Sequence, residues 1–156
     1  GEDFKLNYKF DRQDNLITES MSAMNTGFGI TYVLPILVAV LSAKKDALIL
    51  IENPEAHIHP KGQAVLMKLI AMAVHAGIQV VIETHSDHIV NGSLVAVNQD
   101  LINKEELSLY FFDRDEHKHV AKAHQLHVEE DGHIHPAPPM NFFDQIEIDL
   151  RTLAGF

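Results

Sequence analysis

Residues 48–60, LILIENPEAHIHP, combine a run of apolar residues with a polar, proline-rich segment. Four apolar residues run directly into the polar segment ENPE, and two histidines and a second proline follow. A continuous apolar run of this length is typical of a strand buried on both faces of a sheet. Acidic residues at the end of such a strand are a common place to hold a metal ion, because ligands of open α/β sheets bind at the carboxyl ends of strands.

The segments that follow alternate between helix and strand patterns. Residues 59–77 predict a helix, since Pro60 suits its first turn and Gly77 stands just past its end. Residues 78–86, IQVVIETHS, predict a second buried strand, and Ser86 or Asp87 can cap a helix that runs to about residue 97. Residues 107–115, LSLYFFDRD, predict a third apolar strand. This order predicts an α/β fold, a parallel sheet with helical crossovers.

The two ends of the chain carry simpler patterns. Residues 4–10 alternate apolar and polar side chains and predict a strand, and the apolar segment 30–43 predicts a buried helix with Pro35 near its first turns. Residues 119–135 predict a polar hairpin that turns at EEDGH. Residues 141–156 predict a closing amphipathic helix.

Composition narrows the classes of protein. The 156 residues are 46% hydrophobic, which is enough for one core of ordinary size, and the net charge is −10. There is no basic cluster of the kind that nucleic-acid-binding domains present, no cysteine, and no apolar stretch long enough for a membrane span. These features predict a cytoplasmic protein whose contact with nucleic acid, if it has one, lies outside this chain.

Two polar side chains fall at the ends of neighbouring predicted strands. Glu52 ends the first buried strand and His85 ends the second. Because parallel strands end at the same edge of a sheet, these side chains are expected to lie close together. The alternative for Glu52 is an acidic residue that merely starts a loop, and the alternative for His85 is a structural histidine.

Three motifs in this order resemble those of ABC-type ATPases, in the form seen in the OLD-like and SMC-like branches. NTGFGITYVLPIL (25–37) looks like the signature motif and its helix, LILIENPEAHIHP like the Walker B strand and D-loop, and VVIETHSDHIV (80–90) like the switch-histidine loop. LYFFDRD, EEDGHI and NFFDQIEIDL resemble the small uncharacterised C-terminal domain of one subgroup. The resemblance covers residues 25–154 and implies the C-terminal half of a P-loop NTPase fold, followed by a hairpin and a C-terminal helix.

The resemblance implies roles for the acidic segment. Glu52 takes the position of the Walker B acid and would hold Mg²⁺, in part through water. Asn53 stands where many relatives have a catalytic glutamate, and an amide can orient a water but cannot accept a proton as a base. Glu55 could supply that carboxylate, or it could cap the following loop.

The resemblance also assigns the nucleotide contacts. His85 would be the switch histidine that donates to the γ-phosphate of ATP. The loop Thr26, Gly27, Phe28 and Gly29 would contact ATP bound to the opposite subunit of a homodimer, with a plain loop as the alternative. His57 and His59 fall in the D-loop, which crosses the dimer interface in the family, and His59 replaces the usual aspartate.

One motif of such ATPases is missing from the sequence. None of the eight glycines is followed by lysine, so the phosphate loop G-x-x-x-x-G-K-[ST] is absent. The prediction is therefore a C-terminal ATPase lobe over residues 1–104 and a closing unit over 105–156. The resemblance implies that the Walker A lobe lies far upstream in the same polypeptide and that the present chain does not hydrolyse ATP without it. Relatives of this type act on DNA or with an effector nuclease, which is an analogy only.

Two other functional classes stay open. The chain could be a non-hydrolysing dimerisation and sensor module coupled to an effector, as Asn53 and the missing phosphate loop suggest. It could instead be a metal-dependent hydrolase that uses Glu52, Glu55, His57 and His59. The histidine-rich hairpin (His117, His119, His124, His127, His133 and His135) could bind zinc or nickel, or be a solvated polar hairpin.

Overall fold

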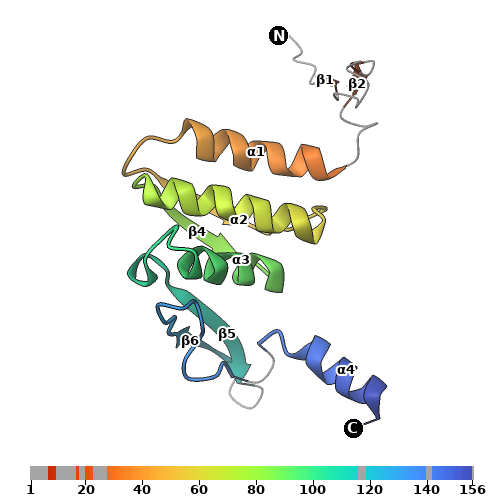
Figure 1. The fold of residues 1–156 in the computed structure, drawn as a ribbon, viewed down its shortest axis with the longest axis vertical. Helices are drawn as coiled ribbons and strands as arrows, with labels where there is room; N and C mark the ends of the chain where they lie inside the picture. Colours follow the sequence, from red (N-terminus) through yellow and green to blue (C-terminus); the bar gives the residue numbers. More distant parts are fainter. Residues whose placement is uncertain are drawn as a thin grey trace.

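The computed structural model describes residues 7–9, 17, 20–22, 28–115, 119–139 and 142–155. Figure 1 shows a mixed α/β arrangement in which three helices stack beside a small parallel sheet, and a separate hairpin and helix follow. The elements are β1 (Asn7–Tyr8), β2 (Met21–Ser22), α1 (Phe28–Ser42), β3 (Leu48–Glu52), α2 (Pro60–His75), β4 (Gln79–Glu83), α3 (Asp87–Asn98), a short 3₁₀ helix (Lys104–Glu106), β5 (Leu109–Asp115), β6 (Val120–Leu126) and α4 (Gln145–Ala154).

The predicted ends of α2 and α3 are confirmed. Pro60 is the first residue of α2, and Gly77 follows its end at φ +89°, a left-handed conformation that glycine adopts without strain. The hydroxyl of Ser86 accepts the backbone N–H of His88 and so caps α3, which makes Ser86 rather than Asp87 the cap.

The predicted helix over residues 30–43 is α1, but its start differs from the prediction. The helix begins at Phe28, so Pro35 lies in its interior and not in its first turns. Proline has no N–H and removes one hydrogen bond of the helical ladder at that position. Val33, Ile36 and Leu37 pack against the core, and this burial offsets the missing bond.

The parallel sheet has two strands in the described part of the chain. β3 and β4 pair in parallel, from Leu48 opposite Gln79 to Glu52 opposite Glu83. The prediction that residues 107–115 add a third parallel strand is wrong, because β5 pairs antiparallel with β6 in a sheet of its own. The next strand along the chain is an immediate partner, and a hairpin needs no crossover connection.

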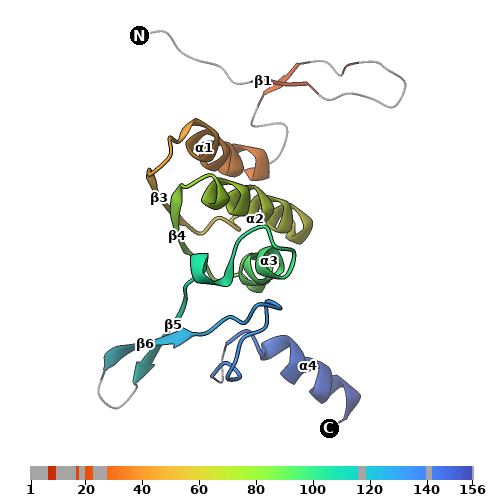
Figure 2. The same ribbon diagram turned by 60° about the vertical axis from the view of Figure 1, so that its left-hand side comes forward.

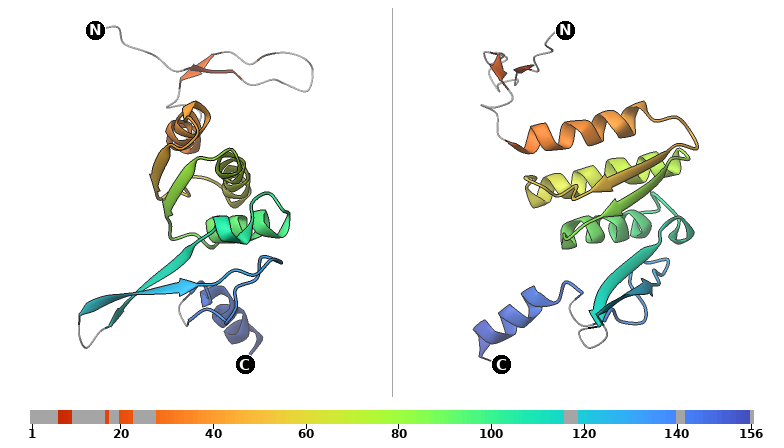
Figure 3. Two further views of the ribbon diagram at one scale, coloured as in Figure 1. Left: turned by 90° about the vertical axis from the view of Figure 1, so that its left-hand side faces the viewer. Right: turned by 180° about the vertical axis from the view of Figure 1, so that it is seen from behind.

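All the described helices that pack on the β3–β4 pair lie on one side of it. Figures 2 and 3 show α1, α2 and α3 on that side, and the core between helices and strands includes Ile51, Leu66, Ile70 and Ile89. Side chains alternate along a strand, so every second residue of β3 and β4 faces away from this core.

The prediction that both strands are buried on both faces is therefore wrong for the described residues. On the side away from the helices Leu48, Leu50 and Val81 are 57%, 70% and 51% exposed. Glu52 and Glu83 continue this face at its carboxyl end, and both are exposed. We call the face formed by these five residues the open face. No described helix covers it (Figure 3).

The C-terminal part of the chain contains the predicted turn and closing helix, but its strands pair differently from the prediction. The turn over EEDGH is confirmed, since the Glu129 N–H donates to the His133 carbonyl at 2.8 Å and Val128 pairs with Ile134. However, residues 120–126 pair with β5 and not with residues 128–135. The predicted closing helix is α4, whose described residues are all exposed.

Candidate functional site

The carboxyl end of the open face gathers the acidic and basic side chains of two strand ends. Glu52 and Glu83 are paired across the two strands, and the Glu83 carboxylate lies 3.2 Å from Nε2 of His85. Because both partners are more than half exposed, solvent screens this contact and it adds little to stability. Parallel pairing has thus brought the ends of residues 48–52 and 79–85 to one edge, as the sequence predicts.

The loop after β3 leaves the sheet through an unusual backbone conformation. Asn53 has φ 47°, in the left-handed region that asparagine tolerates better than most residues. Its N–H donates to the Glu83 carbonyl at 3.0 Å, and the following Pro54 is fully buried. The left-handed backbone is therefore a conformational reason for asparagine at this position, which is independent of any role of its amide in a reaction.

Glu55 spans the gap between this loop and the loop after β4. Its Oε2 accepts the Thr84 hydroxyl at 2.7 Å, and its Oε1 accepts the backbone N–H of His85 at 2.7 Å. Both carboxylate oxygens are engaged, and hydrogen bonds to an ionised acceptor are the strong kind. The side chain thus contacts the second loop and does not cap its own.

A second polar link runs parallel to the first. Buried Gln63 of α2 donates from Nε2 to the Ile58 carbonyl at 2.9 Å, and its Oε1 accepts the Ser86 hydroxyl at 2.5 Å. Sequence reasoning missed Gln63 and Thr84. Thr84 stands inside the ETHS motif, but no signal along the chain marks Gln63, which occupies an ordinary helical position.

The start of α1 meets the same loop. A Cβ added to Gly29 would lie 2.6 Å from the backbone oxygen of His57, so this close approach requires glycine. The rings of Tyr32 and His57 are 4.6 Å apart between centroids. Of the predicted signature loop, Thr26 and Gly27 lie outside the described residues, and the backbone of Phe28 opens α1.

Comparison with known families identifies the class of protein to which the chain belongs. Residues 2–90, more than half of the chain, match the model of the AAA ATPase domain. The chain belongs to this family. Members generally bind ATP with Mg²⁺, so membership indicates an ATPase-type function. Residues 102–153 match a second family, described as a protein of unknown function (DUF3696). No curated protein and no solved structure matches the chain.

The two histidines predicted to lie in a D-loop, His57 and His59, contact different neighbours. The His57 ring lies against Tyr32, whereas Nδ1 of His59 accepts the Lys61 N–H at 3.3 Å and caps α2. Within the described ranges, no three His, Asp or Glu side chains come together in a metal-binding arrangement. The prediction for His117 falls outside the described residues.

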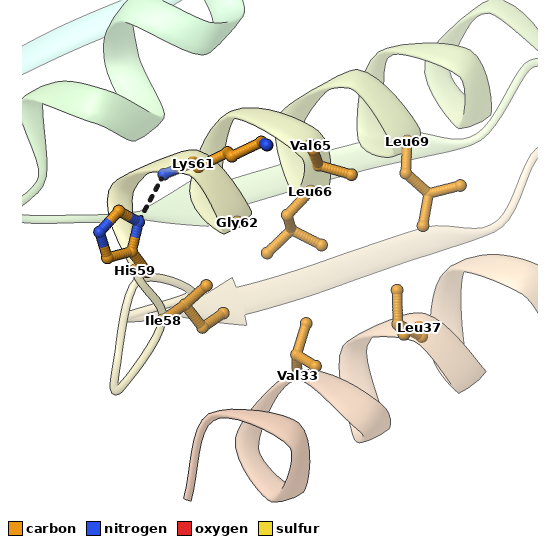
Figure 4. A pocket seen from close by; sticks show the side chains of 9 residues that line it. All are labelled: Val33, Leu37, Ile58, His59, Lys61, Gly62, Val65, Leu66 and Leu69. Atoms are coloured by element: carbon orange, nitrogen blue, oxygen red, sulfur yellow. Dashed lines mark hydrogen bonds between the residues drawn. The ribbon is translucent and has the colours of Figure 1, made fainter. Parts of the chain in front are cut away.

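An apolar groove of about 520 Å³ lies between α1 and α2 (Figure 4). Its lining is Val33, Leu37, Ile58, His59, Lys61, Gly62, Val65, Leu66 and Leu69. Neither Glu52 nor His85 contributes to it. The polar side chains of the two strand ends therefore lie at the open face and not in the groove.

Among the described residues, no helix is both long and apolar enough to cross a membrane.

Proposed function

We propose that this chain is the C-terminal part of an ABC-type, OLD-like ATPase, with ATP and Mg²⁺ bound at the carboxyl end of the open face. The observation that carries the proposal is the position of Glu52 and the Glu83–His85 pair. They stand at the edge of an apolar sheet face that no described helix covers. Such a face favours a covering layer, because exposing leucine and valine side chains to water costs free energy that burial would recover.

The covering layer in this proposal is a Walker A lobe that supplies the missing phosphate loop. Once packed on Leu48, Leu50 and Val81, it would hold the phosphates of ATP next to Glu52. The exposed carboxylate of Glu52 suits Mg²⁺, which binds through one or two carboxylates, water and substrate phosphates. When bound, Mg²⁺ neutralises charge that develops on the phosphates.

The remaining residues have roles that follow from their places around this edge. His85 is positioned to donate from its ring to the terminal phosphate once it leaves Glu83. Asn53 orients the attacking water without accepting its proton. The loop 26–29 contacts the nucleotide of a second subunit in a head-to-tail homodimer, and His57 and His59 face that interface.

Asn53 also favours a second candidate, a non-hydrolysing sensor. An amide at this position cannot act as a general base, and the left-handed backbone explains asparagine without catalysis. Such a module would bind ATP between two subunits and report its presence to an effector. ATP binding without turnover by the protein that includes the upstream sequence would select this candidate over the ATPase.

The open face provides a direct test of the covering lobe. Leu50→Lys should leave the present chain folded, because this side chain is 70% exposed. In the longest gene product that includes upstream sequence, we expect the same change to lower the free energy of unfolding by about 3 kcal/mol or more, since it buries an unpaired charge. Urea unfolding of both proteins measures the difference.

The matched control is Met72→Lys on α2, where the side chain is 57% exposed on a helix. It should be harmless in both proteins. If Leu50→Lys is as mild as Met72→Lys in the longer protein, no lobe covers the open face and the proposed arrangement is wrong.

A further inference from the structure

The geometry of Glu55 raises a question about its part in the proposed reaction. Its position three residues after Glu52 makes it a candidate general base in place of Asn53. A base must reach the attacking water and take up its proton in the transition state. The contacts of Glu55 indicate another role.

Both oxygens of Glu55 are held by the segment that carries the switch histidine. One accepts the Thr84 hydroxyl and the other accepts the backbone N–H of His85, each at 2.7 Å. The second contact is made to the backbone of the very residue whose ring is proposed to touch phosphate. Any shift of the carboxylate therefore shifts the backbone from which the His85 ring extends.

The neighbouring link makes the connection between the two loops stiff. Gln63 joins the Ile58 carbonyl to the Ser86 hydroxyl, and it is only 7% exposed. Ser86 in turn caps α3, and its N–H donates to the Thr84 hydroxyl oxygen at 3.0 Å. His85 thus lies between Thr84 and Ser86, whose side chains are both hydrogen-bonded, and Glu55 is the residue that binds the backbone of His85 itself.

We propose that Glu55 is a positioning residue for His85 and not the general base. It holds the His85 backbone so that the ring can meet the terminal phosphate, and its effect on turnover passes through that ring. The inference rests on the proposed function, since it concerns the same site. It adds a role for Glu55, and for Thr84 as its partner, that family membership does not supply.

The test is a set of double-mutant cycles in the longest gene product that includes upstream sequence. Glu55→Gln should lower kcat for ATP hydrolysis by about 10- to 100-fold, the cost of a small misplacement of a reacting group, with little change in KM. In a His85→Ala background, Glu55→Gln should have no further effect on kcat. The matched control, Glu105→Gln, changes an exposed carboxylate on the 3₁₀ helix and should have no effect.

Thr84→Val provides the second arm, because it keeps the shape of the side chain and removes the hydroxyl, which donates to Glu55 and accepts the Ser86 N–H. It should lower kcat by a smaller factor, and that loss should also vanish without His85. This arm tests the proposal even if Glu55→Gln does not fold, which thermal unfolding would reveal.

The outcomes separate the two claims. If Glu55→Gln lowers kcat by the same factor with and without His85, Glu55 acts independently and the positioning role is wrong. If Glu52→Gln and His85→Ala leave turnover unchanged, the proposed ATP site itself is wrong.

Discussion

Replacing Glu52 by glutamine is expected to lower ATP turnover by roughly 100-fold or more in the longest gene product that includes upstream sequence. The side chain is exposed at the carboxyl end of β3, and glutamine keeps its size while it removes the negative charge that suits Mg²⁺. A loss of two orders of magnitude corresponds to about 2.7 kcal/mol of transition-state stabilisation. Steady-state turnover measured over a range of Mg²⁺ concentrations gives the effect directly.

The control for this change is Glu83→Gln, which removes the neighbouring carboxylate on β4. Glu83 contacts the His85 ring, so we expect a smaller loss that does not depend on Mg²⁺ concentration. Equal losses with the same Mg²⁺ dependence would show that the assignment of the metal to Glu52 is wrong.

His85→Ala is expected to lower kcat by about 100-fold, since it removes a donor aimed at charge that develops in the transition state. The ring is exposed and its present partner is the Glu83 carboxylate at 3.2 Å, so the protein should keep its fold and its unfolding temperature. Binding of ATP should weaken less than kcat falls, because an interaction that is stronger in the transition state acts more on kcat than on binding of the ground state. Turnover and ATP affinity, measured on the same preparation, check both parts.

His75→Ala serves as the matched control, because this histidine is exposed in the last turn of α2 and away from the strand ends. It should leave kcat unchanged. A His85→Ala protein with wild-type turnover would contradict the role as switch histidine and would show that His85 is a surface residue without a part in the reaction.

Much of the fold follows from local patterns. Proline, glycine and serine mark the ends of α2 and α3, and their conformational preferences act within a few residues of the chain. The meeting of Glu52 with the 83–85 segment follows in turn, because two apolar runs joined by a helix pair in parallel. These parts of the site were therefore predictable from the sequence alone.

The wrong predictions of the fold share a physical cause. An apolar sequence pattern predicts that a segment is buried, but several segments of the chain compete to bury it. Residues 109–115 have the apolar character of a core strand, yet their partner is the adjacent strand 120–126. Leu48 and Leu50 are apolar and predict a covering layer, but the described residues provide helices on one side only. An apolar run records a preference for burial and does not show which segment satisfies it.

The polar links of the site were beyond the reach of sequence patterns. Thr84 and Glu55 are 29 residues apart, and Ser86 and Gln63 are 23 apart. Each link depends on how α2 and the loops after β3 and β4 pack at the strand ends. The proposed positioning role of Glu55 therefore comes from the structure and not from its place in the motif.

Calorimetric titration with ATP and Mg²⁺, carried out on this chain alone and on the longest gene product that includes upstream sequence, shows whether an upstream lobe is needed to bind the nucleotide. We expect binding only by the longer protein, and loss of its Mg²⁺ dependence in the Glu52→Gln variant. Equal binding by both proteins, or no binding by either, would contradict the claim that a Walker A lobe on the open face completes this site.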